Sequence, residues 1–295
     1  MDVNTDGGLV QAGRRFAYGR GVRDGIALVY SQSDLGEGDA KGVLVRDRVC
    51  VGAAGAPACV DTGIVAATSL ADTPFRGMPN DGVVGLGLQP LAAGKIMNFL
   101  SRLFDGARNA KMQFGIALMG DVGELHLGGH HAPRFGGPVR WFPVEHPEQG
   151  YWQVAIRAVR VGNVTVDACR RGCHGVVDTG ASRLGVQASH LPLLAAKLKP
   201  KRSPAGSCVG PDLSLDLGGM SLVLPAEEYA DEDCARPRLG SLDLPEPEFV
   251  GVYALGAAVL RRYYAAFDWE FQRVGFAPLS RQAAGDDDDL PIVVF

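Results

Sequence analysis

The tripeptide Asp-Thr-Gly occurs twice in the chain, at residues 61–63 and 178–180. Two aspartate carboxylates held about 3 Å apart cannot both ionise, so they share one proton and their pKa values separate. The ionised carboxylate can then act as a general base on a water molecule, while the protonated one donates a hydrogen bond as the acid. A single carboxylate cannot fill both roles. The first question is therefore which aspartates could form such a pair.

The second copy has the features that hold a reactive carboxylate in place. Asp178 follows an apolar, strand-like segment, and the turn after it contains Thr179, Gly180 and Ser182, whose small groups can hydrogen-bond the carboxylate. We predict that Asp178 is catalytic and that these three residues support it; the alternative is an ordinary aspartate at the end of a strand. No hydroxyl residue follows the glycine of the first copy, so we expect Asp61 to be structural.

Other patterns that could carry chemistry are weak. His130 and His131 are adjacent, and on a strand they would point to opposite faces, so we interpret them as solvated linker residues and not as metal ligands. No glycine-rich phosphate loop is present. We therefore expect no metal and no cofactor.

The elements that must position Asp178 are predicted to be short strands. The chain has 295 residues, of which 40 are glycine and 18 are proline, and so many turns are expected. A strand, a glycine turn over residues 35–42 and a second strand are predicted within 26–51, and a further hairpin within 48–67. A long strand is predicted over 151–161, and helical spacing predicts short helices over 91–104 and 189–198. This pattern is typical of an all-β protein with two lobes.

Charge and hydropathy exclude several classes of partner. The net charge of −4 gives no basic surface for nucleic acid. The longest apolar stretch, at 249–260, is too short to span a membrane. The first residues have neither a basic nor an apolar region, so we predict no signal peptide in this chain.

Six cysteines indicate an oxidising compartment. They form three local pairs, and we predict the disulfides Cys50–Cys59, Cys169–Cys173 and Cys208–Cys234 from among 15 possible connectivities. The alternative is six buried free thiols in a cytosolic protein. The pairing favours the secretory pathway, the extracellular space or another lumenal compartment.

The order of motifs resembles that of pepsin-like aspartic proteases. Asp178-Thr-Gly-Ala-Ser182, with the small cysteine loop before it, looks like the second active-site loop of that family. Residues 35–47 resemble its flap hairpin, which places Leu35, Gly36 and Gly38 at the substrate cleft. Further segments that match the family in order are 80–87, 124–129, 139–144, 150–154, 208–234 and 253–268.

The resemblance implies an all-β, bilobal pepsin-like fold with a few short helices and an incomplete first lobe. Residues 1–146 would form the partial N-terminal lobe with the flap, and residues 147–281 the C-terminal lobe with the Asp-Thr-Gly loop. Residues 282–295 would form an acidic and apolar tail, which we expect to be solvated or to dock on a partner.

Three departures from the family bear on activity. The family's first catalytic aspartate precedes the flap, whereas Asp61 follows it; Asp6 in Thr5-Asp-Gly-Gly8 is the remaining candidate, without the usual flanking hydroxyl residues. Leu35 stands at the position of the flap tyrosine. Ala257 stands where the family usually has an aspartate.

Two functions follow from the resemblance. We expect a chain that lacks a complete pair of carboxylates, does not cleave peptides, and binds a peptide or protein in its cleft or serves as a subunit of an assembly. The alternative is an active aspartic endopeptidase at acidic pH, whose first carboxylate comes from Asp6 or from a separate N-terminal segment. Nucleic acid and membrane lipid are not expected as partners.

Overall fold

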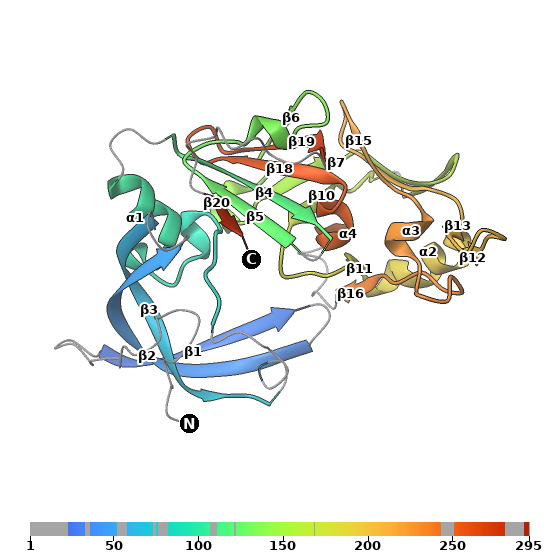
Figure 1. Cartoon of the computed structure of the whole chain (residues 1–295). Coiled ribbons are helices and arrows are strands. Elements are labelled where there is room, and N and C mark those ends of the chain that lie inside the picture. The colour runs from blue at the N-terminus through green and yellow to red at the C-terminus, as the bar shows by residue number, and fades with distance from the viewer. Residues whose placement is uncertain are drawn as a thin grey trace. The chain divides into compact units, whose positions relative to one another are not determined.

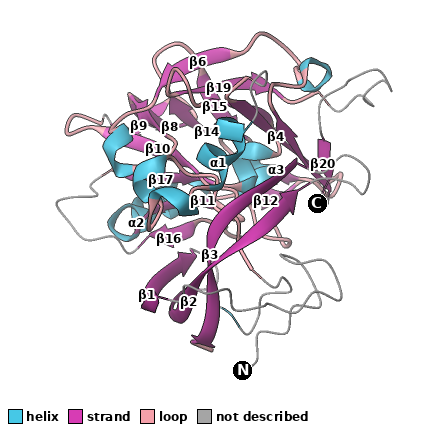
Figure 2. Cartoon of the chain, turned by 90° about the vertical axis from the view of Figure 1, so that its left-hand side faces the viewer, coloured by secondary structure: helices cyan, strands magenta, loops and turns pink. Residues whose placement is uncertain are grey.

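Strands are the main regular structure of the described residues, and their helices are few and short (Figures 1 and 2). The structure is a computed structural model that describes residues 23–32, 36–51, 58–72, 75, 82–106, 111–120, 122–167, 169–242, 251–280 and 292–294. The chain divides into two compact units, Met1–Lys111 with Glu148–Gly150, and Met112–Pro147 with Tyr151–Phe295. The predicted all-β class is confirmed.

The first unit contains a three-stranded antiparallel sheet. Its strands are β1 (Arg23–Gln32), β2 (Gly36–Val51) and β3 (Ala58–Leu70), with β2 in the centre. The helix α1 (Phe99–Gly106) packs against β3 and buries Phe99 and Leu100. Apolar residues on one face of α1 therefore contribute to the core of this unit, together with buried side chains of β2 and β3.

The predicted glycine turn at residues 35–42 is wrong in its position. Gln32 at the end of β1 pairs with Gly36 at the start of β2, so Gly36, Gly38 and Gly42 lie in a strand. Glycine is common both in turns and where two backbones approach closely, so a glycine-rich segment does not by itself distinguish a turn from a strand. At Gly42 a β-carbon would lie 2.5 Å from the Ala66 carbonyl oxygen, beside a register shift in β2.

The second unit contains a six-stranded antiparallel sheet, in which β4 lies between β5 and β18 (Figure 1). In spatial order its strands are β20 (Ile292–Val294), β5 (Val122–Leu127), β4 (Gln113–Met119), β18 (Tyr263–Asp268), β19 (Arg273–Pro278) and β6 (Arg140–Pro143). β20 pairs with residues 124–126 of β5, so part of the C-terminal segment completes an edge of this sheet.

The same unit contains three further sheets. The five-stranded sheet is β16 (Gly240–Leu242), β11 (Leu184–Gln187), β17 (Val252–Leu255), β10 (Cys173–Val177) and β7 (Gln153–Ile156). The four-stranded sheet is β15 (Ser221–Leu224), β14 (Leu213–Asp216), β8 (Ala158–Val161) and β9 (Val164–Asp167), and the two-stranded one is β12 (Lys201–Arg202) and β13 (Cys208–Val209).

The remaining helices are one or two turns long. They are η2 (Gln89–Leu91), η3 (Lys95–Met97), η4 (Ala132–Arg134), η5 (Pro147–Gln149), η6 (Ala188–His190), α2 (Leu191–Leu198), α3 (Ala226–Tyr229) and α4 (Ala257–Leu260). No helix in the described part of the chain has the length and apolar character needed to cross a membrane.

Aromatic side chains form the centre of the second unit. Phe114 of β4 stacks on Phe267 of β18 with ring centroids 4.3 Å apart, and Trp152 meets both rings edge-on. These three side chains are at most 5% exposed. Their burial and ring contacts join β4, β18 and the residues before β7 into one core.

Three disulfides are present, and they join the local pairs. Cys50 and Cys59 lie opposite each other in the register of β2 and β3, and the other two bonds are Cys169–Cys173 and Cys208–Cys234. Each bond restricts the unfolded chain and so stabilises the folded one.

Candidate active site

The loop after β10 holds Asp178. β10 lies between β17, to which it is parallel, and β7, to which it is antiparallel. The Asp178 backbone N–H donates to the Leu255 carbonyl oxygen at 3.3 Å, so β17 fixes the residue at the point where the strand ends. Asp178 itself is exposed. The sheet therefore presents a carboxylate to solvent from a defined backbone position.

Backbone contacts orient the carboxylate. The Gly180 N–H donates to Asp178 Oδ1 at 2.9 Å, and the Ala181 N–H donates to the Asp178 carbonyl oxygen at 3.3 Å. A β-carbon at Gly180 would lie 3.1 Å from Asp178 Oδ1, so a larger residue would crowd the carboxylate. Thr179 and Ser182 are exposed on the same loop.

The loop is also hydrogen-bonded to the start of α4. The Ala257 N–H donates to the Ala181 carbonyl oxygen at 2.7 Å. A β-carbon at Gly256 would collide with the carbonyl oxygens of Ala181 and Arg183, so only glycine fits at this crossing. Asp178 is thus held by β10, β17 and α4 together, which limits its motion.

The other Asp-Thr-Gly copy has a different setting. Asp61 lies within β3, opposite Arg48 of β2, and its carbonyl oxygen accepts a hydrogen bond from Arg102 Nε at 3.3 Å. Thr62 is buried, and its hydroxyl donates to the Ile96 carbonyl oxygen at 2.8 Å. This copy joins β3 to η3 and α1, which agrees with the structural role expected of Asp61.

The remaining residues proposed from the sequence are described only in part. Asp6 and Leu35 lie outside the described residues. Gly36 and Gly38 lie in β2, where they pair with Gln32 and Tyr30 of β1.

The sequence model of the eukaryotic aspartyl protease family matches residues 30–279, which include β1 to β19 apart from the start of β1. The chain belongs to the eukaryotic aspartyl protease family. Renin of Canis lupus familiaris is 31% identical over 262 residues, covering 82% of this chain and 62% of renin. Pepsin-2B of Gadus morhua is 28% identical over 256 residues, covering 82% of this chain and 76% of that pepsin. Against the renins, the chain spans somewhat less than two thirds of their length.

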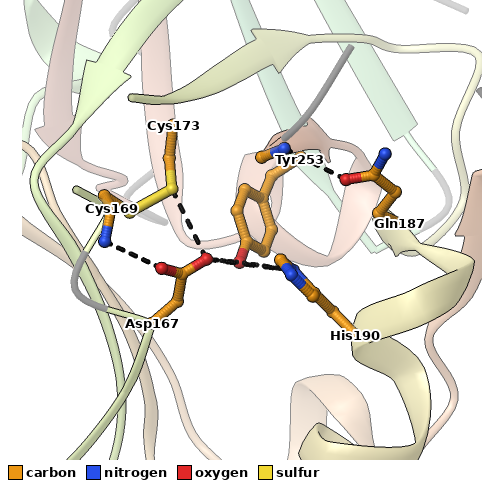
Figure 3. The surroundings of a disulfide bond; sticks show 7 residues. Asp167, Cys169, Cys173, Gln187, His190 and Tyr253 are labelled. Atoms are coloured by element: carbon orange, nitrogen blue, oxygen red, sulfur yellow. Dashed lines mark hydrogen bonds and ion pairs between the residues drawn. A yellow bond between two sulfur atoms is a disulfide. The ribbon is translucent and has the colours of Figure 1, made fainter. Parts of the chain in front are cut away.

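The chain also has an ionisable cluster beside the Cys169–Cys173 disulfide (Figure 3). The Asp167 carboxylate accepts a hydrogen bond from the Cys169 N–H at 2.8 Å and one from the Tyr253 hydroxyl at 3.4 Å. His190 Nδ1 lies 3.9 Å from Asp167 Oδ2. Burial raises the pKa of the Tyr253 hydroxyl, and the Asp167 carboxylate raises it further.

These three side chains line a cavity of about 260 Å³. They come from β9, η6 and β17, which are distant in sequence, so no local pattern could have predicted the cluster. Asp167 holds the backbone of the disulfide loop that leads into β10. The cluster therefore supports the strand that ends at Asp178.

A second ionisable network lies in the six-stranded sheet and was also not predicted. His126 and His131 stack with ring centroids 4.7 Å apart, and the Tyr264 hydroxyl lies 3.1 Å from His126 Nδ1. Arg134 Nε donates to Glu124 Oε2 at 2.7 Å. His131 is 1% exposed, so its interpretation as a solvated linker residue is wrong. Its ring is covered because it packs against His126, whose own ring is fully buried in β5.

The network favours the neutral form of His126. Its pKa is lowered to about 4, mainly by burial and also by His131, while Glu124 acts in the opposite direction. Burial acts to raise the pKa of Glu124, but the hydrogen bond and charge of Arg134 outweigh it and lower that pKa. The Tyr264 hydroxyl accepts the His131 backbone N–H at 3.1 Å, and its own proton can be donated to His126 Nδ1.

Proposed function

We propose that this chain binds extended peptide segments at the site around Asp178, and that on its own it does not hydrolyse them efficiently. The observation that carries the proposal is the contrast between the two Asp-Thr-Gly copies. Asp178 follows a strand on a loop whose backbone orients the carboxylate, whereas Asp61 lies inside β3. Family membership supports a peptide as the ligand.

The reason for weak hydrolysis is the need for two carboxylates. One must activate water and the other must protonate or hydrogen-bond the substrate carbonyl. Loss of one acid–base partner costs on the order of 10²–10⁴ in rate. Asp178 alone can orient and polarise a bound group, which suits binding better than turnover.

An active endopeptidase is the second candidate, and the family match from residue 30 to residue 279 favours it. In that case a second carboxylate must approach Asp178, from Asp6 or from a separate segment. The reaction would then be peptide hydrolysis by general acid–base catalysis at acidic pH.

The three disulfides support an oxidising compartment, because such bonds are rare where cytosolic reductants act. We accordingly place the protein in the secretory pathway, outside the cell, or in another lumenal compartment. Its ligands there would be peptides or exposed segments of proteins.

A turnover experiment separates the two functions. The chain is incubated with a fluorogenic peptide library at about pH 5, with and without pepstatin, and the products are separated by mass. The variants are Asp178→Asn, the matched control Asp61→Asn, and Asp6→Asn. Binding without turnover is expected.

Pepstatin-sensitive turnover that is lost in Asp178→Asn but kept in Asp61→Asn would overturn the proposal and establish the peptidase. Its additional loss in Asp6→Asn would then identify the second carboxylate. Absence of both binding and turnover in a folded chain would contradict both functions.

A further inference from the structure

Three metal-ligating side chains converge at a place that neither Asp-Thr-Gly copy occupies. The ligand atoms of Glu145, His146 and His174 all lie within 4.8 Å of one another. The two imidazole rings are 5.3 Å apart between centroids and nearly perpendicular, at 72°. One carboxylate and two imidazoles are a common set of protein ligands for a divalent transition metal.

The fold fixes the backbone of each ligand. Glu145 follows β6, and its N–H donates to the Gln153 carbonyl oxygen at 2.9 Å. His174 lies in β10 between two paired strands, and its N–H donates to the Gly251 carbonyl oxygen at 3.0 Å. Both ligands therefore come from hydrogen-bonded backbone, which reduces the entropy lost when a metal binds.

The backbone of His146 is strained in a way that its sequence does not explain. Its φ is 49°, in the left-handed region that non-glycine residues rarely adopt. Pro147 follows, and a proline restricts the preceding residue to extended conformations. Strain of this kind is found preferentially at functional sites, where the geometry that it produces is used. Here it accompanies a ring that lies beside the ring of His174.

We propose that Glu145, His146 and His174 bind one Zn²⁺ ion, with water at the fourth position. Two imidazole nitrogens and one carboxylate oxygen match the ligands that Zn²⁺ takes in sites with three protein ligands. Ca²⁺ and Mg²⁺ prefer oxygen ligands throughout, so they fit this set poorly. The adjacent histidines at 130 and 131 gave no reason to expect a metal, whereas this set joins residues from β10 and the segment after β6.

A metal at this site would link the segment after β6 to β10. Glu145 and His146 lie just after β6 of the six-stranded sheet, and His174 lies in β10 of the five-stranded sheet, whose end carries Asp178. A metal that binds only the folded chain stabilises it by mass action. Zinc would therefore raise the Tm of the chain and hold β10 in place, without taking part in chemistry at Asp178.

The test is zinc binding by the full, untagged chain after removal of bound metal with a chelator. Isothermal titration calorimetry with Zn²⁺ is expected to give one ion per chain. Thermal unfolding with and without Zn²⁺ is expected to show a higher Tm with the ion. Glu145→Gln and His174→Gln should each weaken binding by about 100-fold or more, since even the loss of outer partners costs 10–100-fold. Glu148→Gln is the matched control, because it removes an exposed neighbouring carboxylate from outside the set; its affinity should not change.

Titration with Co²⁺ provides a second readout, because its visible absorption reports the ligands and their geometry. The spectrum should change in His146→Gln and stay the same in Glu148→Gln. Failure to bind one zinc ion per chain would overturn the proposal, as would equal binding by Glu145→Gln or equal weakening by the control. Circular dichroism of each metal-free variant checks folding, and Glu145→Gln decides the result if His174→Gln does not fold.

Discussion

Lowering the pH should destabilise this protein through His126. Its ring is fully buried in β5, and its pKa in the folded chain is about 4, against 6.5 as the ordinary value. The folded state therefore binds this proton less tightly than the unfolded state does. The stability that neutral His126 contributes is complete above about pH 6.5 and is lost as the pH falls towards 4.

The magnitude follows from the two pKa values. Proton linkage gives a loss of about 2 kcal/mol in the free energy of unfolding between pH 7.5 and pH 5, and about 3 kcal/mol by pH 4. Glu124 acts in the same direction, because its pKa is lowered in the fold and it loses its pairing with Arg134 when it is protonated. The losses from the two groups should overlap at the lower end of this range.

The assay is urea denaturation, followed by tryptophan fluorescence at pH 7.5, 6 and 5. The perturbation is His126→Gln, which removes the titration and leaves a polar side chain that can face the Tyr264 hydroxyl. The variant should lose about 2 kcal/mol less than the wild-type chain between pH 7.5 and pH 5. His190→Gln, at the cavity beside the Cys169–Cys173 disulfide, is the matched control and should keep the wild-type loss. Equal pH dependence of wild type and His126→Gln would show that protonation of His126 does not cause the loss.

Three further predictions concern packing and covalent structure. Tyr264→Phe removes the hydroxyl that contacts the His131 N–H and His126 Nδ1. It should lower the free energy of unfolding by about 1–3 kcal/mol, measured by urea denaturation at pH 7.5, because these two groups lose a hydrogen-bond partner. Gly256→Ala should lower the free energy of unfolding by about 1–3 kcal/mol, seen as a fall in Tm, and should abolish pepstatin binding. Gly85→Ala, where a β-carbon would meet nothing within 4 Å, should change neither quantity. Replacing both cysteines of Cys208–Cys234 with serine should cost about 3.5 kcal/mol, against about 2 for Cys169–Cys173, because the first bond closes the longer loop; equal losses in urea would contradict this.

Local patterns in the sequence predicted the elements that depend on local pairing. The hairpin of β2 and β3, with Cys50 opposite Cys59, follows from two apolar runs separated by a turn. The helix predicted over 91–104 exists only from Phe99, after the short η2 and η3. Gly94 lies within the predicted range and separates η2 from η3, in agreement with the weakening effect of glycine on a helix.

Elements that depend on distant partners could not be predicted. The strand expected over 151–161 is two strands, because Arg157 leaves the five-stranded sheet and its N–H donates to the Asp216 carbonyl oxygen at 2.7 Å. The pairing of β20 with β5 joins the C-terminal segment to the middle of the chain. Apolar periodicity reports that a face is buried but not which segment covers it.

The residues of the candidate sites also differ in whether local sequence could predict them. The loop that carries Asp178 could be predicted because its residues are consecutive. The cluster of Asp167, His190 and Tyr253 and the set of Glu145, His146 and His174 could not, because each is assembled from separate strands and loops.

Asp178 is proposed to form a peptide-binding site that does not by itself support turnover. Calorimetric titration of the wild-type chain and of Asp178→Asn with pepstatin at about pH 5, with Asp61→Asn as control, tests it most directly. Saturable binding that weakens by at least about tenfold in Asp178→Asn and is unchanged in Asp61→Asn is predicted, since hydrogen bonds to a charged group contribute about 1.5–3 kcal/mol. Equal affinity of the wild-type chain and Asp178→Asn, or no binding by the folded wild-type chain, would contradict the claim.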